Sequence, residues 1–333
     1  MKKLLTLLFL CLSVFAYSQK ITRFVWLENE EVKNLTTRKL VLCSYTESDA
    51  EIERLKKKLE KAKDEKKKEI QGRIDYHESL NAIFKAEMVK IVKENWTVSS
   101  TENVEVMTFQ QLKSMEGNAL GKEKAVLMLR YFEKSGSVYD PSRASVDLPA
   151  MTFQGGDKFG MNNNLISFPL LYSNEDNHCR KDAALTIKLL DKLVRANMTG
   201  KKRLDVDDFV EMEIAKNCKQ KKSKETIINK NLLKKVEVAE VKEAYGSKVL
   251  ALSNDEFVSS YQGKEEVLAA VCLPSTIAEG TTFGISSSAL IFGRLIINNQ
   301  TAEICGYSNF IMGEKAGELM FKKGHFSNMG ECK

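Results

Sequence analysis

GKEKAVLML, residues Gly121–Leu129, decides the fold, because a related stretch, GKEEVLAAV, returns at Gly263–Val271. Each copy begins with a glycine turn and a Lys-Glu pair, and continues as an apolar run of strand length. A short helical candidate precedes each copy, at Gln110–Met115 and at Asp255–Tyr261. We therefore predict two copies of one α/β unit, each built around one of these strands.

The order of the remaining segments agrees with this duplication. Runs rich in β-branched and aliphatic residues predict strands at Arg38–Tyr45, Val104–Phe109, Ala125–Phe132, Leu148–Phe153 and Leu165–Tyr172, and again at Thr226–Asn229, Lys248–Leu252, Glu266–Leu273, Ala289–Ile297 and Thr301–Ser308. Helices are expected at Asp176–Met198, Leu232–Tyr245 and Glu314–Lys323. The predicted fold class is α/β (α+β), with two tandem mixed-sheet units and helices packed on the sheets.

A protruding, charged helical hairpin is expected within the first unit, at residues 47–96. Lys and Glu crowd Asp49–Lys68, where opposite charges at helical spacing favour a solvated helix. A coiled-coil partner site is the alternative for this segment. Gly72 is expected to separate the two helices, and the apolar stripe of Ile74–Trp96 is expected to face the sheet.

The first 18 residues have the pattern of a secretory signal peptide, with Lys2 and Lys3 before the apolar run Leu4–Phe15. That run is shorter than the roughly 20 residues of a membrane span, and no later stretch approaches this length, so we expect no transmembrane segment. The expected location is the periplasm, the cell surface or the medium. The expected units are residues 19–200 and 225–333, joined by a basic linker with a helix at residues 201–224.

Export permits disulfide bonds, and six cysteines remain once the signal peptide is removed. Cys43 and Cys272 lie in expected buried strands, where a cysteine serves as a small apolar residue. The remaining candidates for disulfide bonds, with their pairing left open, are Cys179, Cys218, Cys305 and Cys332.

Motifs that would indicate a cofactor or a metal are incomplete. Gly117–Lys122 has three residues between its glycines, where a P-loop has four, and it precedes a strand instead of a helix. Asp205–Asp208 resembles the start of a calcium loop, but Val210 and Lys216 stand where an EF-hand needs Gly and Glu. The three histidines have no ligand spacing, so we expect no catalytic residue, no cofactor and no metal.

Two features are candidates for a partner surface. Trp26 lies in the β-prone segment Ile21–Leu27, and the linker carries Lys219, Lys221 and Lys222. These lysines are interpreted as an exposed linker, with contact to an anionic envelope surface as the alternative. The formal charge of +6 is mild, and the lysine cluster lacks interleaved aromatic residues, so nucleic acid is not an expected partner.

The first half of the chain resembles envelope α/β domains, namely the N-terminal domain of TolB and the periplasmic part of curli-secretion (CsgG-type) proteins. Arg38–Tyr45, Ile74–Trp96 and Val104–Phe109 carry this resemblance, and the second half is similar more loosely. The chain is also similar to lysine-rich exported proteins of Gram-negative bacteria with no assigned activity. The resemblance implies partner binding without chemistry, and the charged helix at Asp49–Lys68 departs from it.

These observations together favour an exported, non-enzymatic binding or scaffolding protein of the periplasm or cell surface. The expected partner is an envelope protein or peptide, held in a groove between the two units, and the oligomeric state stays open. The alternative is a hydrolase that acts on envelope polymers, with its site at the same junction. A pocket with converging Asp, Glu, His or Ser side chains would favour the hydrolase, whereas an apolar or strand-edge groove would favour binding.

Overall fold

The computed structural model describes most of the chain after residue 31. The described residues are 32–33, 35–43, 47–115, 123–134, 146–154, 164–173, 179–200, 204–246, 248–282, 285–308 and 319–330. The predicted signal peptide, Trp26 and Cys332 lie outside these residues.

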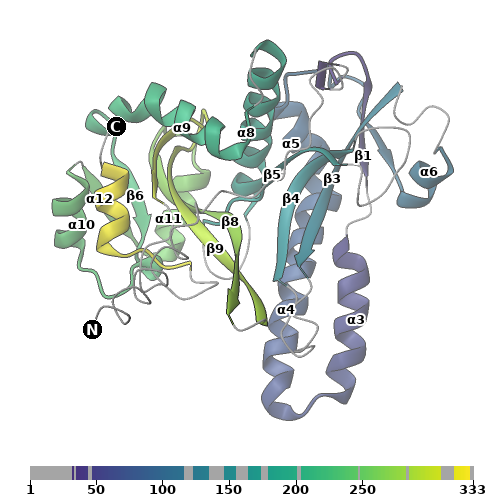
Figure 1. Cartoon of the computed structure of the whole chain (residues 1–333), viewed down its shortest axis with the longest axis horizontal. Coiled ribbons are helices and arrows are strands. Elements are labelled where there is room, and N and C mark those ends of the chain that lie inside the picture. The colour runs from purple at the N-terminus through teal and green to yellow at the C-terminus, as the bar shows by residue number, and fades with distance from the viewer. Residues whose placement is uncertain are drawn as a thin grey trace, which may run out of the picture.

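The first unit contains a five-stranded mixed sheet (Figure 1). Its strands are β1 (Lys39–Cys43), β2 (Glu105–Met107), β3 (Lys124–Lys134), β4 (Val146–Gln154) and β5 (Asn164–Pro169). The strand order is β2-β1-β3-β4-β5, with β1 parallel to both of its neighbours and β4 antiparallel to both of its own. The parallel pairs are joined through helices, as parallel connections require.

The second unit repeats this sheet. Its strands are β6 (Thr226–Asn229), β7 (Val249–Leu252), β8 (Leu268–Thr282), β9 (Ile285–Asn298) and β10 (Ile304–Ser308). Read from its parallel edge, the order is β7-β6-β8-β9-β10, and the parallel and antiparallel pairs fall in the same places as in the first unit. The predicted fold class, two tandem mixed-sheet α/β units, is therefore confirmed.

The helices also follow the same order in the two units. The first unit has α3 (Glu47–Lys61), α4 (Asp64–Ala82), the π-helix η1 (Ile83–Glu87), α5 (Met88–Asn95), α6 (Phe109–Ser114) and α8 (Arg180–Thr199). The connection holds α9 (Val206–Asn217) and the 3₁₀-helix η2 (Cys218–Lys222), and the second unit has the 3₁₀-helix η3 (Lys230–Leu232), α10 (Val238–Tyr245), α11 (Asn254–Gln262) and α12 (Lys323–Gly330). In each unit, the helix before the second strand and the helix before the third strand lie on opposite sheet faces, as right-handed crossovers require.

The two repeated stretches lie in equivalent strands but are offset by one residue. In the first unit, Leu127 faces α5 and α8 and lies six residues after Gly121. In the second unit, the equivalent face, covered by α10 and α12, holds Leu268 and Ala270, five and seven residues after Gly263. The sequence match therefore identifies the strand but not the inward-facing residues, since a shift of one residue exchanges the two faces.

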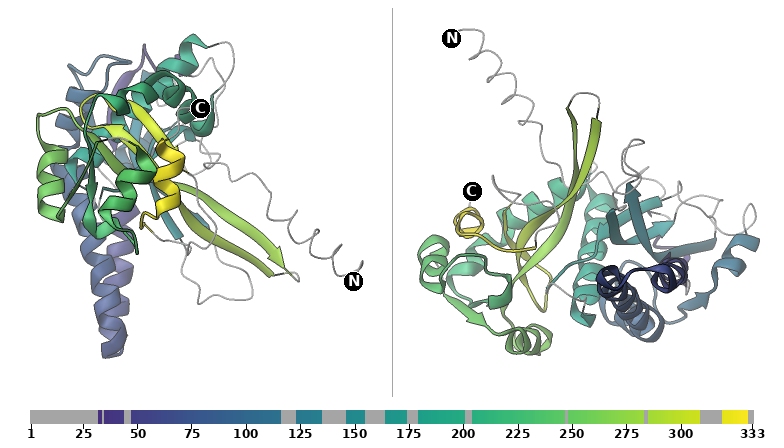
Figure 2. Two further views of the ribbon diagram at one scale, coloured as in Figure 1. Left: turned by 90° about the vertical axis from the view of Figure 1, so that its left-hand side faces the viewer. Right: turned by 90° about the horizontal axis from the view of Figure 1, so that it is seen from below.

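The charged helical hairpin projects from the first unit, as the sequence predicts (Figures 1 and 2). Ile52 and Leu55 of α3 and Ile74 of α4 are buried along the seam between its helices. The turn, however, falls at residues 62–63 instead of at Gly72, which lies inside α4, where a methyl group added to the glycine would meet no atom within 4 Å. An exposed helix tolerates this glycine, because its cost of about 1 kcal/mol is small beside the packing of the seam.

Two predicted helices differ from the structure. The helix expected at Leu232–Tyr245 begins only at Val238, because Leu233 forms a parallel bridge with Phe321 and Lys235 has a φ of 51°. Of the predicted helix Glu314–Lys323, residues 314–318 lie outside the described residues, and residues 319–322 are not helical because Phe321 forms this bridge, so α12 begins only at Lys323. In both cases a tertiary contact overrides local helix propensity.

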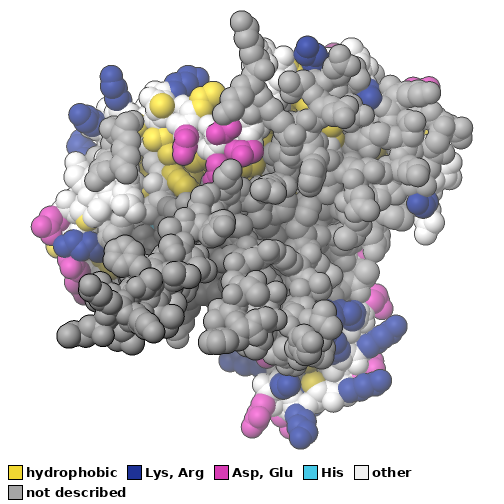
Figure 3. Space-filling model, in the orientation of Figure 1, with side chains coloured by type: hydrophobic (Ala, Val, Ile, Leu, Met, Phe, Trp, Pro, Cys, Tyr) yellow, Lys and Arg dark blue, Asp and Glu magenta, His cyan; other side chains and the backbone are white. Residues whose placement is uncertain are grey.

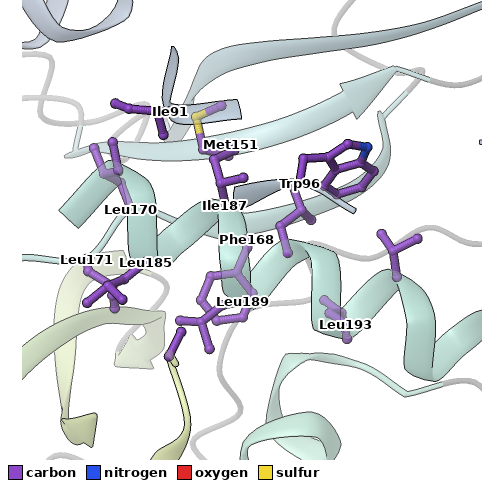
Figure 4. Close-up of a cluster of buried hydrophobic side chains, with 14 of the residues drawn as sticks. Ile91, Trp96, Met151, Phe168, Leu170, Leu171, Leu185, Ile187, Leu189 and Leu193 are labelled. Atoms are coloured by element: carbon purple, nitrogen blue, oxygen red, sulfur yellow. The ribbon is translucent and has the colours of Figure 1, made fainter. Parts of the chain in front are cut away.

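One hydrophobic cluster continues through both units. The buried face of α8 belongs to this cluster, together with side chains of the first sheet, of α11 and of the second sheet. Figure 4 shows Ile187 and Leu189 of α8 beside Phe168 and Met151 of the first sheet. Tyr172 and Cys272 also exchange two backbone hydrogen bonds, of 2.9 and 2.8 Å, between the units. The two units therefore share a core instead of meeting across a surface.

Candidate functional site

A cavity of about 710 Å³ lies in the first unit, at the carboxyl ends of β1 and β2. Its walls are Leu42, Cys43, Asp49, Phe84, Lys85, Met88, Val89, Val106, Thr108, Gln110, Leu127, Met128, Leu129 and Met151. These residues come from the sheet, from the start of α3, from the helical run through η1 and α5, and from the start of α6.

The topology explains why the cavity lies here. The chain leaves β1 for the hairpin helices on one sheet face, and leaves β2 for α6 on the opposite face. Two such connections separate beyond the carboxyl ends of neighbouring parallel strands and leave a crevice there, which is the usual ligand position in open α/β sheets.

Most of the cavity wall is apolar. Leu42 and Leu127 are buried neighbours in the sheet, and Met88, Met128 and Met151 contribute three thioethers. Methionine side chains are flexible and polarizable, so they adapt to apolar groups of different shapes. The wall therefore suits an apolar occupant better than a reacting polar one.

The π-helix η1 supplies two of the wall residues, Phe84 and Lys85. It interrupts a helical run that otherwise continues from α4 into α5. A π-turn adds a residue to the helix and rotates the side chains on either side of it, which is why such turns are frequent at functional sites. Here Phe84 stays half-buried at the cavity, although its position falls within an apolar helical stripe.

The cavity wall has four polar residues, and three of them, Asp49, Lys85 and Thr108, are engaged in hydrogen bonds within the protein. The Asp49 carboxylate accepts hydrogen bonds from Lys85 Nζ at 2.6 Å and from Asn81 Nδ2 at 3.0 Å. Thr108 caps α6, since its hydroxyl accepts from the backbone N–H of Gln111 at 3.2 Å. Asp49 is thus held as one half of an ion pair, and this arrangement favours orientation of a bound group over proton transfer.

A second polar cluster lies where the two units meet. The fully buried Asp182 carboxylate accepts hydrogen bonds from the hydroxyls of Ser173 and Tyr261, each at 3.0 Å, and from the backbone N–H of Cys179 at 2.8 Å. Burial raises the pKa of Asp182 to about 6, although these three donors oppose the shift. Burial also raises the pKa of the Cys179 thiol far above its usual value.

This cluster holds the units together and is poorly suited to catalysis. A thiol with a raised pKa stays protonated and is a weak nucleophile. Ser173, Asp182 and Tyr261 are buried, and none of them lines the cavity of the first unit. The junction, where the sequence places a groove, is filled at its centre by this cluster and by the shared core, and the cavity lies within the first unit instead.

The predicted disulfide cysteines have different states. Cys218 is disulfide-bonded, and its partner lies outside the described residues, as does Cys332. Cys179 and Cys305 have free thiols, which differs from the prediction for these two. Cys179 is the residue just before α8, and its backbone N–H donates to Asp182. Cys305 is buried in β10.

The predicted lysine surface of the linker is only partly exposed. Lys219 and Lys222 are exposed, but Lys221 is buried. Its ammonium donates to the carbonyl oxygen of Met329 and lies 5.9 Å from the ring centre of Tyr245, and burial lowers its pKa. Lys221 is therefore a structural residue and not part of a partner surface.

Neither a metal centre nor a membrane span is found in the part of the chain that the structure describes. Within it, no group of three or more His, Cys, Asp and Glu side chains is arranged to hold a metal ion. Likewise, none of the helices described is both long and apolar enough to cross a bilayer.

No family model, curated protein or solved structure matches the chain. The resemblance to envelope α/β domains therefore stays a prediction.

Proposed function

We propose that the protein is an exported, non-enzymatic binding protein that holds apolar side chains of a partner peptide or protein in the cavity of its first unit. The observation that carries the proposal is an apolar cavity of about 710 Å³ beside the edge of a sheet. The signal-peptide pattern of the first 18 residues supports export, and the cavity supports binding.

The backbone of a partner peptide would pair with the edge strand of the first sheet. β2 is the terminal strand of the first sheet among the described residues. Val106 in this strand is 54% exposed, points to the same sheet face as Leu42, and lines the cavity. An extended peptide that pairs with an edge strand directs alternate side chains to one face, so its apolar residues would enter the cavity.

The hydrolase alternative has less support. The cavity wall contains one carboxylate, Asp49, and Lys85 neutralises it at 2.6 Å. A carboxylate-pair hydrolase needs two such groups about 5–10 Å apart around the bond to be cleaved. The acid at the junction, Asp182, is fully buried.

A small apolar molecule is a second candidate occupant. The volume of about 710 Å³ falls in the range of about 300–1,000 Å³ that ligand pockets occupy. Such a ligand would leave the edge of β2 free, whereas a peptide would cover it. The two occupants therefore differ in whether the edge of β2 stays accessible.

Photo-crosslinking from the edge strand tests the proposal. Benzoylphenylalanine is placed at Val106 in β2 or, as the matched control, at Leu250 in β7, which is 43% exposed on the edge strand of the second unit. We expect one discrete crosslinked protein from an envelope extract with the Val106 probe and none with the Leu250 probe. A synthetic peptide from the captured segment must then compete with the crosslink. Equal, non-competed labelling from both positions would contradict the proposal.

A further inference from the structure

The tip of the helical hairpin concentrates the positive charge of the protein. Residues Lys56–Lys68 contain eight lysines and three acidic residues, a net charge of +5, whereas the whole chain has a formal net charge of +6. Thirteen residues thus account for nearly all of the excess charge. The lysines occur on α3, in the turn and on α4, so both helices of the hairpin and their turn contribute to the basic tip.

The hairpin holds this charge away from the body. The hairpin contacts the body at Tyr76, whose hydroxyl lies 2.8 Å from that of Tyr172. Fourteen residues of the turn and α4, residues 62–75, precede this contact, which at 1.5 Å per residue corresponds to about 20 Å. Figure 3 shows basic side chains gathered on the projecting end of the molecule.

Few of these charges are neutralised within the protein. Two lysines form ion pairs, Lys67 with Asp64 at 2.8 Å and Lys56 with Glu78 at 3.4 Å. The other six lysines are exposed and form no ion pair with any described residue, namely Lys57, Lys58, Lys61, Lys63, Lys66 and Lys68. Unpaired like charges at this density repel one another, so a partner with negative charge would relieve the repulsion.

We propose that this tip docks end-on to an anionic membrane surface through electrostatic attraction. A planar array of lipid phosphates matches a projecting tip whose net charge is +5. Nucleic acid fits less well, because no aromatic residue occurs between Glu47 and Asp75 to stack on bases. The apolar residues nearest the turn, Leu59 and Ile70, are partly covered, so the contact is at the surface without insertion.

Co-sedimentation with vesicles tests the docking. The mature protein is mixed with vesicles of phosphatidylcholine alone or with about 30% phosphatidylglycerol, at low salt and at physiological salt. We compare a K57Q/K61Q/K66Q variant with a K216Q/K219Q/K222Q variant, in which three exposed linker lysines are changed. Both variants lose the same total charge, so they differ only in where it is lost. Circular dichroism verifies that both remain folded.

We expect the wild type to bind the anionic vesicles only, with affinity that falls as salt rises. The hairpin variant should lose about tenfold or more of this affinity, since each basic residue near an anionic surface contributes severalfold, and the linker variant should lose less than about twofold. Equal losses in the two variants, or no binding to anionic vesicles, would overturn the proposal. Tighter binding to a single-stranded polynucleotide than to the vesicles would also overturn it, in favour of a nucleic-acid partner.

Discussion

At the scale of single residues, Asp182 is a carboxyl group that is fully buried. Its carboxylate links the start of α8 to Tyr261 of α11, and therefore joins the two units. Burial favours the neutral acid and the three donors favour the anion, and burial wins, because the pKa rises from 3.8 to about 6. The folded protein therefore binds a proton here at a pH where the unfolded chain does not.

We expect Asp182 to make the protein more stable as the solution becomes mildly acidic. Its folded pKa is raised, so this contribution is fully present below pH 3.8 and is lost as the pH rises through about 6. Between pH 7 and pH 4.5 it should add about 2 kcal/mol to the free energy of unfolding. Asp182→Asn should remove this increment, which urea unfolding at the two pH values measures. The nearby Cys179 and Tyr261 have raised pKa values and stay neutral throughout.

Subtracting the variant from the wild type cancels the titration of all other groups. The same pH dependence in Asp182→Asn and in the wild type would show that the carboxylate is solvated, and that the two units are joined in another way.

At the scale of helices and strands, two glycines give opposite expectations for the same substitution. Gly72→Ala should raise the free energy of unfolding by about 1 kcal/mol, because Gly72 lies in an exposed helix with open space around it. Gly246→Ala should lower it by about 1–2 kcal/mol, because Gly246 ends α10 with a φ of 68°. Midpoints of urea unfolding report both effects. A destabilised Gly72→Ala would mean that α4 is broken at this residue, as the sequence alone suggests.

The strands were predictable because their residues are apolar in long runs. Thr226–Asn229 matches β6 residue for residue, and the runs around β1 and β3 differ from the structure only at their ends. The hairpin turn at residues 62–63 was not predictable, because Ala62 and Lys63 have no turn signal and Gly72 has one. The start of α10 was not predictable for a different reason, since the bridge from Leu233 to Phe321 joins segments far apart in the chain.

At the scale of the whole molecule, the shared core implies that the two units unfold together. Leu189 of α8 is fully buried in the cluster that contains side chains of both sheets. Leu189→Ala should lower the free energy of unfolding by about 2–5 kcal/mol. Tryptophan fluorescence, to which Trp26 and Trp96 both contribute, and far-UV circular dichroism of the whole chain should then shift to the same lower urea midpoint. Two separated transitions would show that the units are independent domains.

The cavity could not be predicted from the sequence, although the α/β class could. Its walls come from segments up to about a hundred residues apart, from Leu42 to Met151. Each wall residue alone has the character of a core residue, and the sequence places Met88 and Val106 simply in a helix stripe and a strand. The carboxyl ends of parallel strands are a general indication of a site, but which strands are parallel is known only from the topology.

The most direct test of the account is titration with an apolar fluorescent probe such as N-phenylnaphthylamine. Val106→Trp fills the mouth of the cavity, and Leu250→Trp places the same side chain on the matching edge strand of the second unit. We expect the wild type and Leu250→Trp to bind one probe per protein with equal affinity, and Val106→Trp to lose at least about tenfold in affinity. Equal binding by all three proteins, or no binding by the wild type, would contradict the claim that the first unit holds an apolar binding site.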